Sequence, residues 1–171
     1  SDVCSSDLIT TGNYGWKIDQ AKETAALVSL IKNGEQTSRE PEYSQKAASH
    51  SGNDYGNTYV EINLTAQHLY FYANGKLLVE SDFVSGNAAK GWSTPAGAYS
   101  ITYKQRNATL KGQGYATPVS YWMPFNGGIG LHDANWRKTF GGTIYKNGGS
   151  HGCVNLPPAV AKTIYENISA G

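Results

Sequence analysis

The spacing of hydrophobic positions changes near residue 57 and divides the chain into two parts. Before this point the apolar residues recur at the spacing of one helix face: Ala26, Leu27, Leu30 and Ile31. Asp19 is suited to cap the start of such a helix and Gly34 to end it, so we predict one amphipathic helix from Asp19 to Asn33. The residues that follow, up to 56, include Pro41 and many Gly, Ser and Asn residues, which indicates extended backbone and a linker.

After residue 57 the pattern is that of β-strands. Apolar side chains alternate with more polar ones at Val60, Ile62 and Leu64. Asn74-Gly75 separates two apolar runs, 68–73 and 76–84, and this dipeptide predicts a β-hairpin. Alternation or short apolar runs predict further strands over 98–105, 119–123 and 129–132. Pro157 and Pro158 suit the first turn of a terminal helix. The second part is therefore predicted to be mostly β with a C-terminal helix.

These patterns predict part of one domain followed by a second domain. One helix with one strand cannot bury its apolar face alone, so residues 1–56 are expected to form the small α+β C-terminal part of a preceding domain and a linker. Residues 57–171 form the second domain. The first eight residues, S-D-V-C-S-S-D-L, lack periodicity and are expected to be a frayed end that contains Cys4.

Composition narrows the class of protein. Hydrophobic residues are 39% and charged residues 16% of the 171, which favours a folded chain over a disordered one. The net charge is +1 with scattered Lys and Arg, so a nucleic-acid partner is not expected. No apolar run approaches the roughly 20 residues that cross a bilayer, and this predicts a soluble chain. Two cysteines, Cys4 and Cys153, do not make a disulfide framework.

The densest group of reactive side chains surrounds Cys153. It lies in the segment Ser150-His151-Gly152-Cys153-Val154-Asn155, and His132 and Asp133 precede it. A free thiol is mostly protonated at neutral pH, so a nucleophilic cysteine needs a nearby imidazole. Gly152 leaves room for backbone N–H groups that would stabilise an oxyanion. An unpaired cysteine is more often a small buried hydrophobe, but this polar setting favours a nucleophile.

Two questions stay open on the residues alone. His132, His151 and Cys153 offer three zinc ligands, although no Cys-x-x-Cys or H-E-x-x-H pair accompanies them. Either histidine is also a possible base. In an extended segment His151 would share a face with Cys153, which favours His151 unless Gly152 bends the chain.

The segment S-H-G-C-V-N, with His132 eighteen positions before Ser150, resembles the signature of the L,D-transpeptidase catalytic domain, also called the YkuD domain. The element T-P-A-G at residues 94–97 is similar to another motif of that family. In the first part, G-W-K-I-D and P-E-Y-S resemble the end of the peptidoglycan-binding domain that precedes some Gram-positive members.

The resemblance implies a β-sandwich and a cell-wall acyltransferase without a cofactor or metal. Cys153 would be acylated by a tetrapeptide stem of peptidoglycan, D-Ala would leave, and a neighbouring stem would accept the acyl group. His132 would be the base. Ser150, His151, Gly152 and Asn155 would shape the site and its oxyanion hole, and Asp133 would act through its main chain. Carbapenem-type β-lactams would be covalent inhibitors.

Aromatic side chains before the nucleophile are candidates to line a peptide cleft: Tyr115, Tyr121, Trp122, Phe125 and Trp136. The same residues would equally suit a core. Two alternatives remain, a carboxypeptidase or cysteine endopeptidase acting on wall peptides and a non-catalytic wall-binding module. With any of these we expect an extracytoplasmic protein at the cell wall or cell surface, secreted or membrane-anchored at full length.

Overall fold

A computed structural model describes residues 12–51, 53–112 and 114–171, so Cys4 and the expected frayed end lie outside the described residues. The described chain divides into two compact units, one of residues 13–56 and one of residues 57–171 together with Gly12. In the part of the chain described, no helix is long and apolar enough to cross a membrane.

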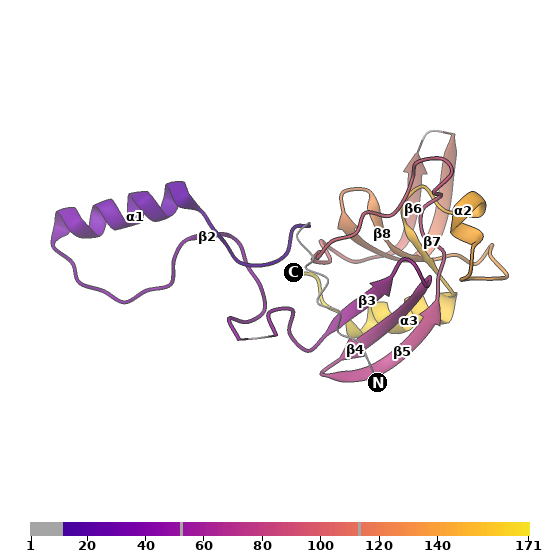
Figure 1. Ribbon diagram of the computed structural model, residues 1–171, viewed down its shortest axis with the longest axis horizontal. Coiled ribbons are helices and arrows are strands. Elements are labelled where there is room, and N and C mark those ends of the chain that lie inside the picture. The colour runs from indigo at the N-terminus through magenta and orange to yellow at the C-terminus, as the bar shows by residue number, and fades with distance from the viewer. Residues whose placement is uncertain (1–11, 52, 113) are drawn as a thin grey trace. The chain divides into compact units, whose positions relative to one another are not determined.

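The N-terminal unit is a helix beside a short two-stranded sheet (Figure 1). Strand β1 (Lys17–Ile18) precedes helix α1 (Gln20–Asn33) and pairs antiparallel with β2 (Tyr43–Gln45). The helix has the predicted ends: Asp19 Oδ1 accepts from the Lys22 N–H at 3.1 Å, and Gly34 adopts a left-handed φ of 66°. The predicted helix is confirmed. On its apolar face Leu27 and Ile31 are exposed, whereas Ala26 and Leu30 are half-buried.

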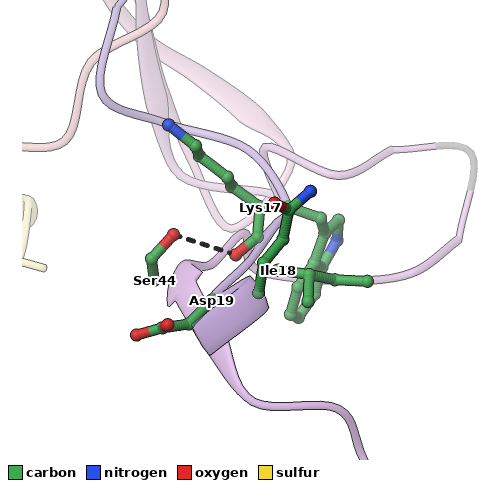
Figure 2. Close-up of a pocket in the computed structure, with 6 residues that line it drawn as sticks. Lys17, Ile18, Asp19 and Ser44 are labelled. Atoms are coloured by element: carbon green, nitrogen blue, oxygen red, sulfur yellow. Dashed lines mark hydrogen bonds between the residues drawn. The ribbon is translucent and has the colours of Figure 1, made fainter. Parts of the chain in front are cut away.

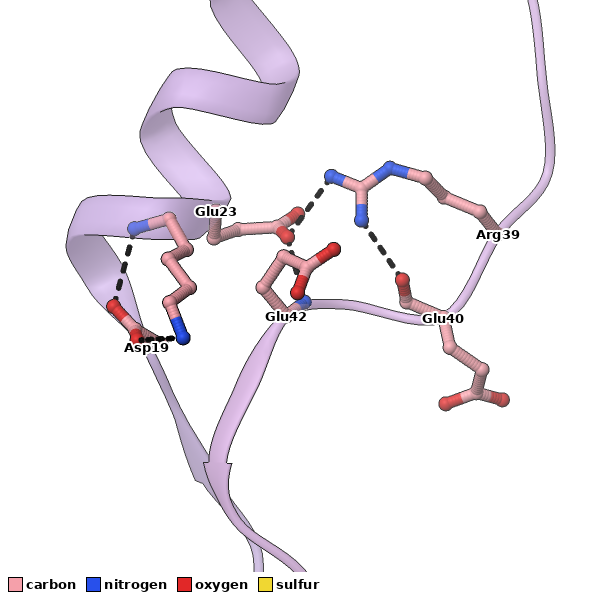
Figure 3. A network of polar contacts seen from close by, with 6 residues as sticks. Asp19, Glu23, Arg39, Glu40 and Glu42 are labelled. Carbon is pink, nitrogen blue, oxygen red and sulfur yellow. Dashed lines mark hydrogen bonds and ion pairs between the residues drawn. The ribbon is translucent and has the colours of Figure 1, made fainter.

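A carboxylate on α1 holds the following loop against the helix (Figure 3). Glu23 Oε2 accepts from Arg39 Nη2 at 2.9 Å and from the Glu42 backbone N–H at 2.8 Å. The Glu42 N–H makes the larger contribution to lowering the pKa of Glu23 below its ordinary value. Arg39 also donates to the Glu40 carbonyl at 2.8 Å. These polar contacts therefore fix the path of the loop that connects the end of α1 to β2.

The second unit begins with a three-stranded antiparallel sheet. Its strands are β3 (Tyr59–Asn63), β4 (His68–Ala73) and β5 (Lys76–Asp82), in that order. Asn74 and Gly75 join β4 to β5 with φ angles of 52° and 76°, which are the positive values that a tight hairpin turn requires. The predicted hairpin is confirmed.

A four-stranded sheet carries the reactive residues. Strands β6 (Gln105–Gly112), β7 (Tyr115–Asn126), β8 (Ile129–Asp133) and β9 (Val154–Leu156) lie in that order, and only β8 and β9 are parallel among them. Parallel neighbours need a crossover, which here contains the short helix α2 (Ile144–Gly148). The predicted terminal helix is confirmed as α3 (Pro158–Asn167).

Both sheets and α3 share one hydrophobic core. Phe71 of β4, Met123 of β7, Leu156 of β9 and Ile164 of α3 are all fully buried in it. Tyr121 and Phe125 also belong to this core, so they do not line a cleft. The unit is thus mostly β, with two sheets packed over a common core and a C-terminal helix, as predicted.

The strand prediction over 98–105 is wrong. Residues 99–104 form no ladder, and Ala98 makes only an isolated bridge to Gly12. The alternation there reflects burial of Ile101 next to less buried residues. The strand expected over 119–123 is confirmed as the central part of β7, which is longer than predicted, with twelve residues, and runs through Pro118 and Pro124. β8 pairs with β7 only from Trp122 onward, so Pro118 lies at an edge, and Pro124 lies at a register shift.

Candidate active site

Cys153 and His132 are brought together by the parallel pairing of β8 with β9. His132 is the register partner of Asn155, and Leu131 is the partner of Val154. Cys153 comes directly before β9 and packs against the cluster that contains Trp122, the register partner of His132, so Cys153 lies on the face of the sheet that carries Trp122 and His132. Two residues separated by 21 positions in sequence therefore lie on one face at one end of the sheet.

Main-chain contacts fix the orientation of the His132 ring. Its Nδ1 lies 2.8 Å from the Asp133 carbonyl oxygen, which can only accept, so Nδ1 carries the proton and Nε2 holds a lone pair. Burial lowers the pKa of His132, and the contact with Asp133 opposes that shift only in part. The ring has Trp122 and Trp136 as aromatic neighbours, with centroids 6.0 Å away in each case. His132 is thus a neutral imidazole with a defined tautomer.

The side-chain carboxylate of Asp133 hydrogen-bonds to β7 rather than to the His132 ring. Its Oδ1 accepts the Tyr121 backbone N–H at 2.8 Å, and the residue is buried. Asp133 therefore contacts His132 through its main chain, and its side chain ties β8 to β7.

The Cys153 thiol lies among glycines of β8 and of the turn before it. Sγ donates to the Gly128 carbonyl oxygen at 3.6 Å. Burial raises the pKa of the thiol, while a hydrogen bond from the Gly130 backbone lowers it by less. At rest Cys153 is accordingly a thiol and His132 a neutral imidazole.

A compact turn shapes the segment before the thiol. Ser150 Oγ donates to the Cys153 carbonyl at 2.5 Å and accepts the Gly152 N–H at 3.0 Å. Gly152 has a φ of 121°, which L-residues with a Cβ rarely adopt. The segment is bent, so the argument that an extended chain places His151 on the face of Cys153 does not apply. The N–H of Gly152 is also already engaged with Ser150.

His151 is held between two aromatic rings. Its centroid lies 4.2 Å from that of Trp92 and 4.7 Å from that of Tyr115, and both pairs are stacked. Tyr115 begins β7, at the end of the β6–β7 hairpin, and Gly112 opposite has no Cβ to displace its ring. The stack places His151 at the rim of the site.

Thr94 is a buried contact of this segment to which sequence reasoning gave no role. Its Oγ1 donates to the Gly152 carbonyl at 2.7 Å and accepts the Gly86 N–H at 3.0 Å. A Cβ at Gly86 would lie 1.8 Å from the Trp92 carbonyl oxygen, so only glycine fits there. The signal available was the T-P-A-G element itself.

A cavity of about 240 Å³ opens beside Cys153. Tyr115 and Trp122 line it with Cys153, as do Gly128 and Lys111. Trp122 donates to the Tyr103 hydroxyl at 3.2 Å, which fixes its indole. Trp136 is not part of this lining and stands by His132. Of the five candidate cleft residues, Tyr115 and Trp122 therefore border the cavity.

Asn155 is buried next to these groups. Its backbone exchanges hydrogen bonds with Val84 in both directions, at 2.9 and 3.0 Å. Its side-chain Oδ1 is buried without a hydrogen-bond partner among the described residues.

The geometry gives no support to the zinc alternative. Among the described residues, no three His, Cys, Asp or Glu side chains are grouped to hold a metal ion. A larger hollow of about 750 Å³ lies in the N-terminal unit, bordered by Lys17, Ile18, Asp19 and Ser44 (Figure 2). Neither a thiol nor an imidazole lines it, so it is not a second site of the same chemistry.

Comparison with known proteins decides the family. The family model of the L,D-transpeptidase catalytic domain, YkuD, matches residues 57–171. The chain belongs to this family. No curated protein sequence matches it.

Solved L,D-transpeptidases share the fold. A mutant of the Enterococcus faecium L,D-transpeptidase is 36% identical, with a TM-score of 0.79 over 95% of this chain and 66% of that one. The chain thus spans just under two thirds of that protein. The catalytic domain of the E. faecium enzyme acylated by ertapenem is 42% identical, with a TM-score of 0.61 over 67% of this chain and 92% of that one. An L,D-transpeptidase from Stackebrandtia nassauensis is 25% identical, with a TM-score of 0.55 over 95% of this chain and 93% of that one.

Proposed function

We propose that this member of the L,D-transpeptidase family is a peptidoglycan transpeptidase with Cys153 as nucleophile and His132 as base. The observation that carries the proposal is the shared face of Cys153 and His132, with the His132 tautomer fixed by the Asp133 carbonyl. A neutral imidazole with an unprotonated Nε2 is the form that accepts a thiol proton.

The proposed reaction has two acyl transfers. The thiol gives its proton to His132, and the sulfur attacks the carbonyl carbon that joins the third residue of a tetrapeptide donor to its terminal D-Ala. The C–N bond breaks, the imidazolium gives the proton to the leaving amine, and D-Ala departs from a thioester on Cys153. The side-chain amine of the third residue of an acceptor stem then attacks the thioester, its proton passes to His132, and the thiol is restored with a 3-3 crosslink formed.

The neighbouring residues have supporting roles in this proposal. Ser150 and Gly152 hold the bend that presents the thiol, through the contacts at 2.5 and 3.0 Å. His151, stacked on Trp92, supports the oxyanion or the bound stem. Asn155 positions its strand beside His132. No step requires a cofactor.

Carbapenems are proposed as covalent inhibitors, because they present a strained carbonyl to the same thiol. The E. faecium catalytic domain that is 42% identical has been solved acylated by ertapenem, and a relative 37% identical has been solved as an avibactam carbamoyl enzyme. Since peptidoglycan lies outside the cytoplasm, we also propose an extracytoplasmic location at the cell wall, with secretion or membrane anchoring of the full-length protein.

Product analysis tests the function. The purified chain is incubated with a disaccharide-tetrapeptide donor, and products are identified by mass spectrometry, with Cys153→Ala as the control. A dimer that has lost one D-Ala is the expected product. Tripeptide alone would identify the carboxypeptidase alternative, and cleavage within a crosslinked dimer the endopeptidase. Binding to peptidoglycan without any Cys153-dependent product would contradict the proposal and favour a wall-binding module.

A further inference from the structure

Arg137 is a half-buried cation without an anionic partner in the described part of the chain. It follows β8 in a turn where its N–H donates to the Ala134 carbonyl at 3.0 Å. Nη2 donates to the Gly148 carbonyl at 2.9 Å, so the guanidinium is held in place. Nε is buried and has no hydrogen-bond partner among the described residues. Within that same set, no carboxylate forms an ion pair with it.

This cation acts on the candidate base. The charge of Arg137 contributes to lowering the pKa of His132, which shows that the two lie within electrostatic reach. Burial also lowers the pKa of Arg137, because a partly desolvated cation lacks compensation from an anion. Trp136, which precedes Arg137, is 48% exposed and faces the His132 ring. An uncompensated charge of this kind beside reactive groups indicates a ligand of opposite sign.

The chemistry of the leaving group supplies such a ligand. His132 must reach the departing amine of D-Ala to protonate it, so that amine lies on the His132 side of the thiol. In D-Ala the amine and the carboxylate are attached to the same carbon. The carboxylate is therefore within a few ångströms of His132, and Arg137 lies within electrostatic reach of that residue. A guanidinium fixed at one Nη is suited to bind a carboxylate through its remaining N–H groups.

We propose that Arg137 binds the C-terminal carboxylate of the donor stem and selects donors that end in a free D-amino acid. This inference rests on the proposed transpeptidase function and adds a specificity-determining residue to it. Lys138, the next residue in the chain, is an exposed cation and does not line the cavity beside Cys153. Lys138→Gln is accordingly the matched control for loss of a charge.

The test compares two tetrapeptide donors that differ only in a terminal carboxylate or carboxamide. With the free acid, kcat/KM for acylation of the wild type should exceed that with the amide by at least about tenfold. Arg137→Gln should remove this preference by slowing the acid and sparing the amide. Arg137→Lys should keep part of it, and Lys138→Gln all of it. An unchanged preference in Arg137→Gln, or equal slowing of both donors, would overturn the inference.

A second measurement does not depend on transpeptidation. Iodoacetate is an anion and iodoacetamide is its neutral analogue, and the ratio of their rates at Cys153, followed by peptide mass spectrometry, reports a cation near the thiol. Arg137→Gln should lower this ratio several-fold, with the iodoacetamide rate nearly unchanged. If the wild type acylates with neither donor, the proposed function fails, and this ratio still decides the anion site. A ratio equal to that of the wild type would overturn it.

Discussion

Thr94 Oγ1 donates a 2.7 Å hydrogen bond to the carbonyl oxygen of Gly152, the residue before the proposed nucleophile. The same hydroxyl accepts from Gly86 at 3.0 Å, so one buried side chain joins the 84–87 segment to the nucleophile's bend. The position of Cys153 thus depends on a residue 59 places earlier in the chain.

Thr94→Val should therefore impair both stability and acylation. The variant keeps the shape of the side chain but leaves a buried N–H and a carbonyl without partners, at about 1–3 kcal/mol each. Denaturant unfolding measures the loss of stability, and acylation kinetics should show at least a tenfold slower reaction. Thr94→Ser keeps the hydroxyl and should stay close to wild type. If the serine variant were as impaired as the valine variant, the hydrogen bonds would not be the cause.

The pH dependence of acylation should report His132. Because burial lowers its pKa, the imidazole stays neutral below the ordinary histidine value of about 6.5, so the acid limb should lie at lower pH than that. Burial raises the pKa of Cys153, so free thiolate should appear only above the ordinary thiol range. The rates of thiol alkylation and of acylation are measured from about pH 4 to about pH 10, at steps of roughly half a pH unit.

Two histidine variants separate the roles. His132→Ala should lose the acid limb and react about 10²–10⁴-fold more slowly near neutral pH, with a rate that follows the thiolate alone. His151→Ala should keep the acid limb and still reduce transpeptidation, since its ring contacts Trp92 and Tyr115 at the rim. Loss of the acid limb only in the His151 variant would exchange the two assignments.

The bend at Gly152 should be intolerant of a side chain. A Cβ there would lie 3.2 Å from Ile129 Cδ1, at a φ of 121° that costs about 1–3 kcal/mol for an L-residue. Gly152→Ala should lower the melting temperature and the acylation rate together. Gly148→Ala, in α2, meets its nearest atom at 3.5 Å and should affect neither. Equal tolerance of both changes would contradict the bend as a requirement.

Local features of this fold were predictable, and features that depend on pairing were not. Asn74-Gly75 and the two ends of α1 are set by residues within a few positions, so the sequence pattern located them correctly. β7 was predicted too short because Pro118 and Pro124 suggested strand ends, whereas the edge position and the register shift that accommodate them depend on where β8 pairs.

The same distinction holds in the site. Cys153 and His132 were identifiable from residue type and motif, but their shared face follows from a parallel register across a crossover. The bend at Gly152 turned His151 towards Trp92, which an extended segment would not predict. The roles of Thr94 and Arg137 arise from contacts at a distance in sequence or from burial. The T-P-A-G element marked the position of Thr94 but not its contacts, and no local pattern indicated Arg137.

We propose that residues 57–171 form an independent catalytic domain. The described strands β3 to β9, helix α3 and every candidate catalytic residue lie within it. The fragment should fold and be acylated at a rate within about threefold of the longer chain, as measured by circular dichroism and intact mass. A folded fragment that cannot be acylated would show that the first part contributes to the site.

The most direct test of the account is the intact mass of the protein after incubation with a carbapenem. We expect the wild type to gain one drug mass, with the modified peptide containing Cys153, because this thiol alone among the described residues has the His132 imidazole on its face of the sheet. Cys153→Ala should gain none. A Cys153→Ala protein that still gained one drug mass would contradict the assignment of the nucleophile.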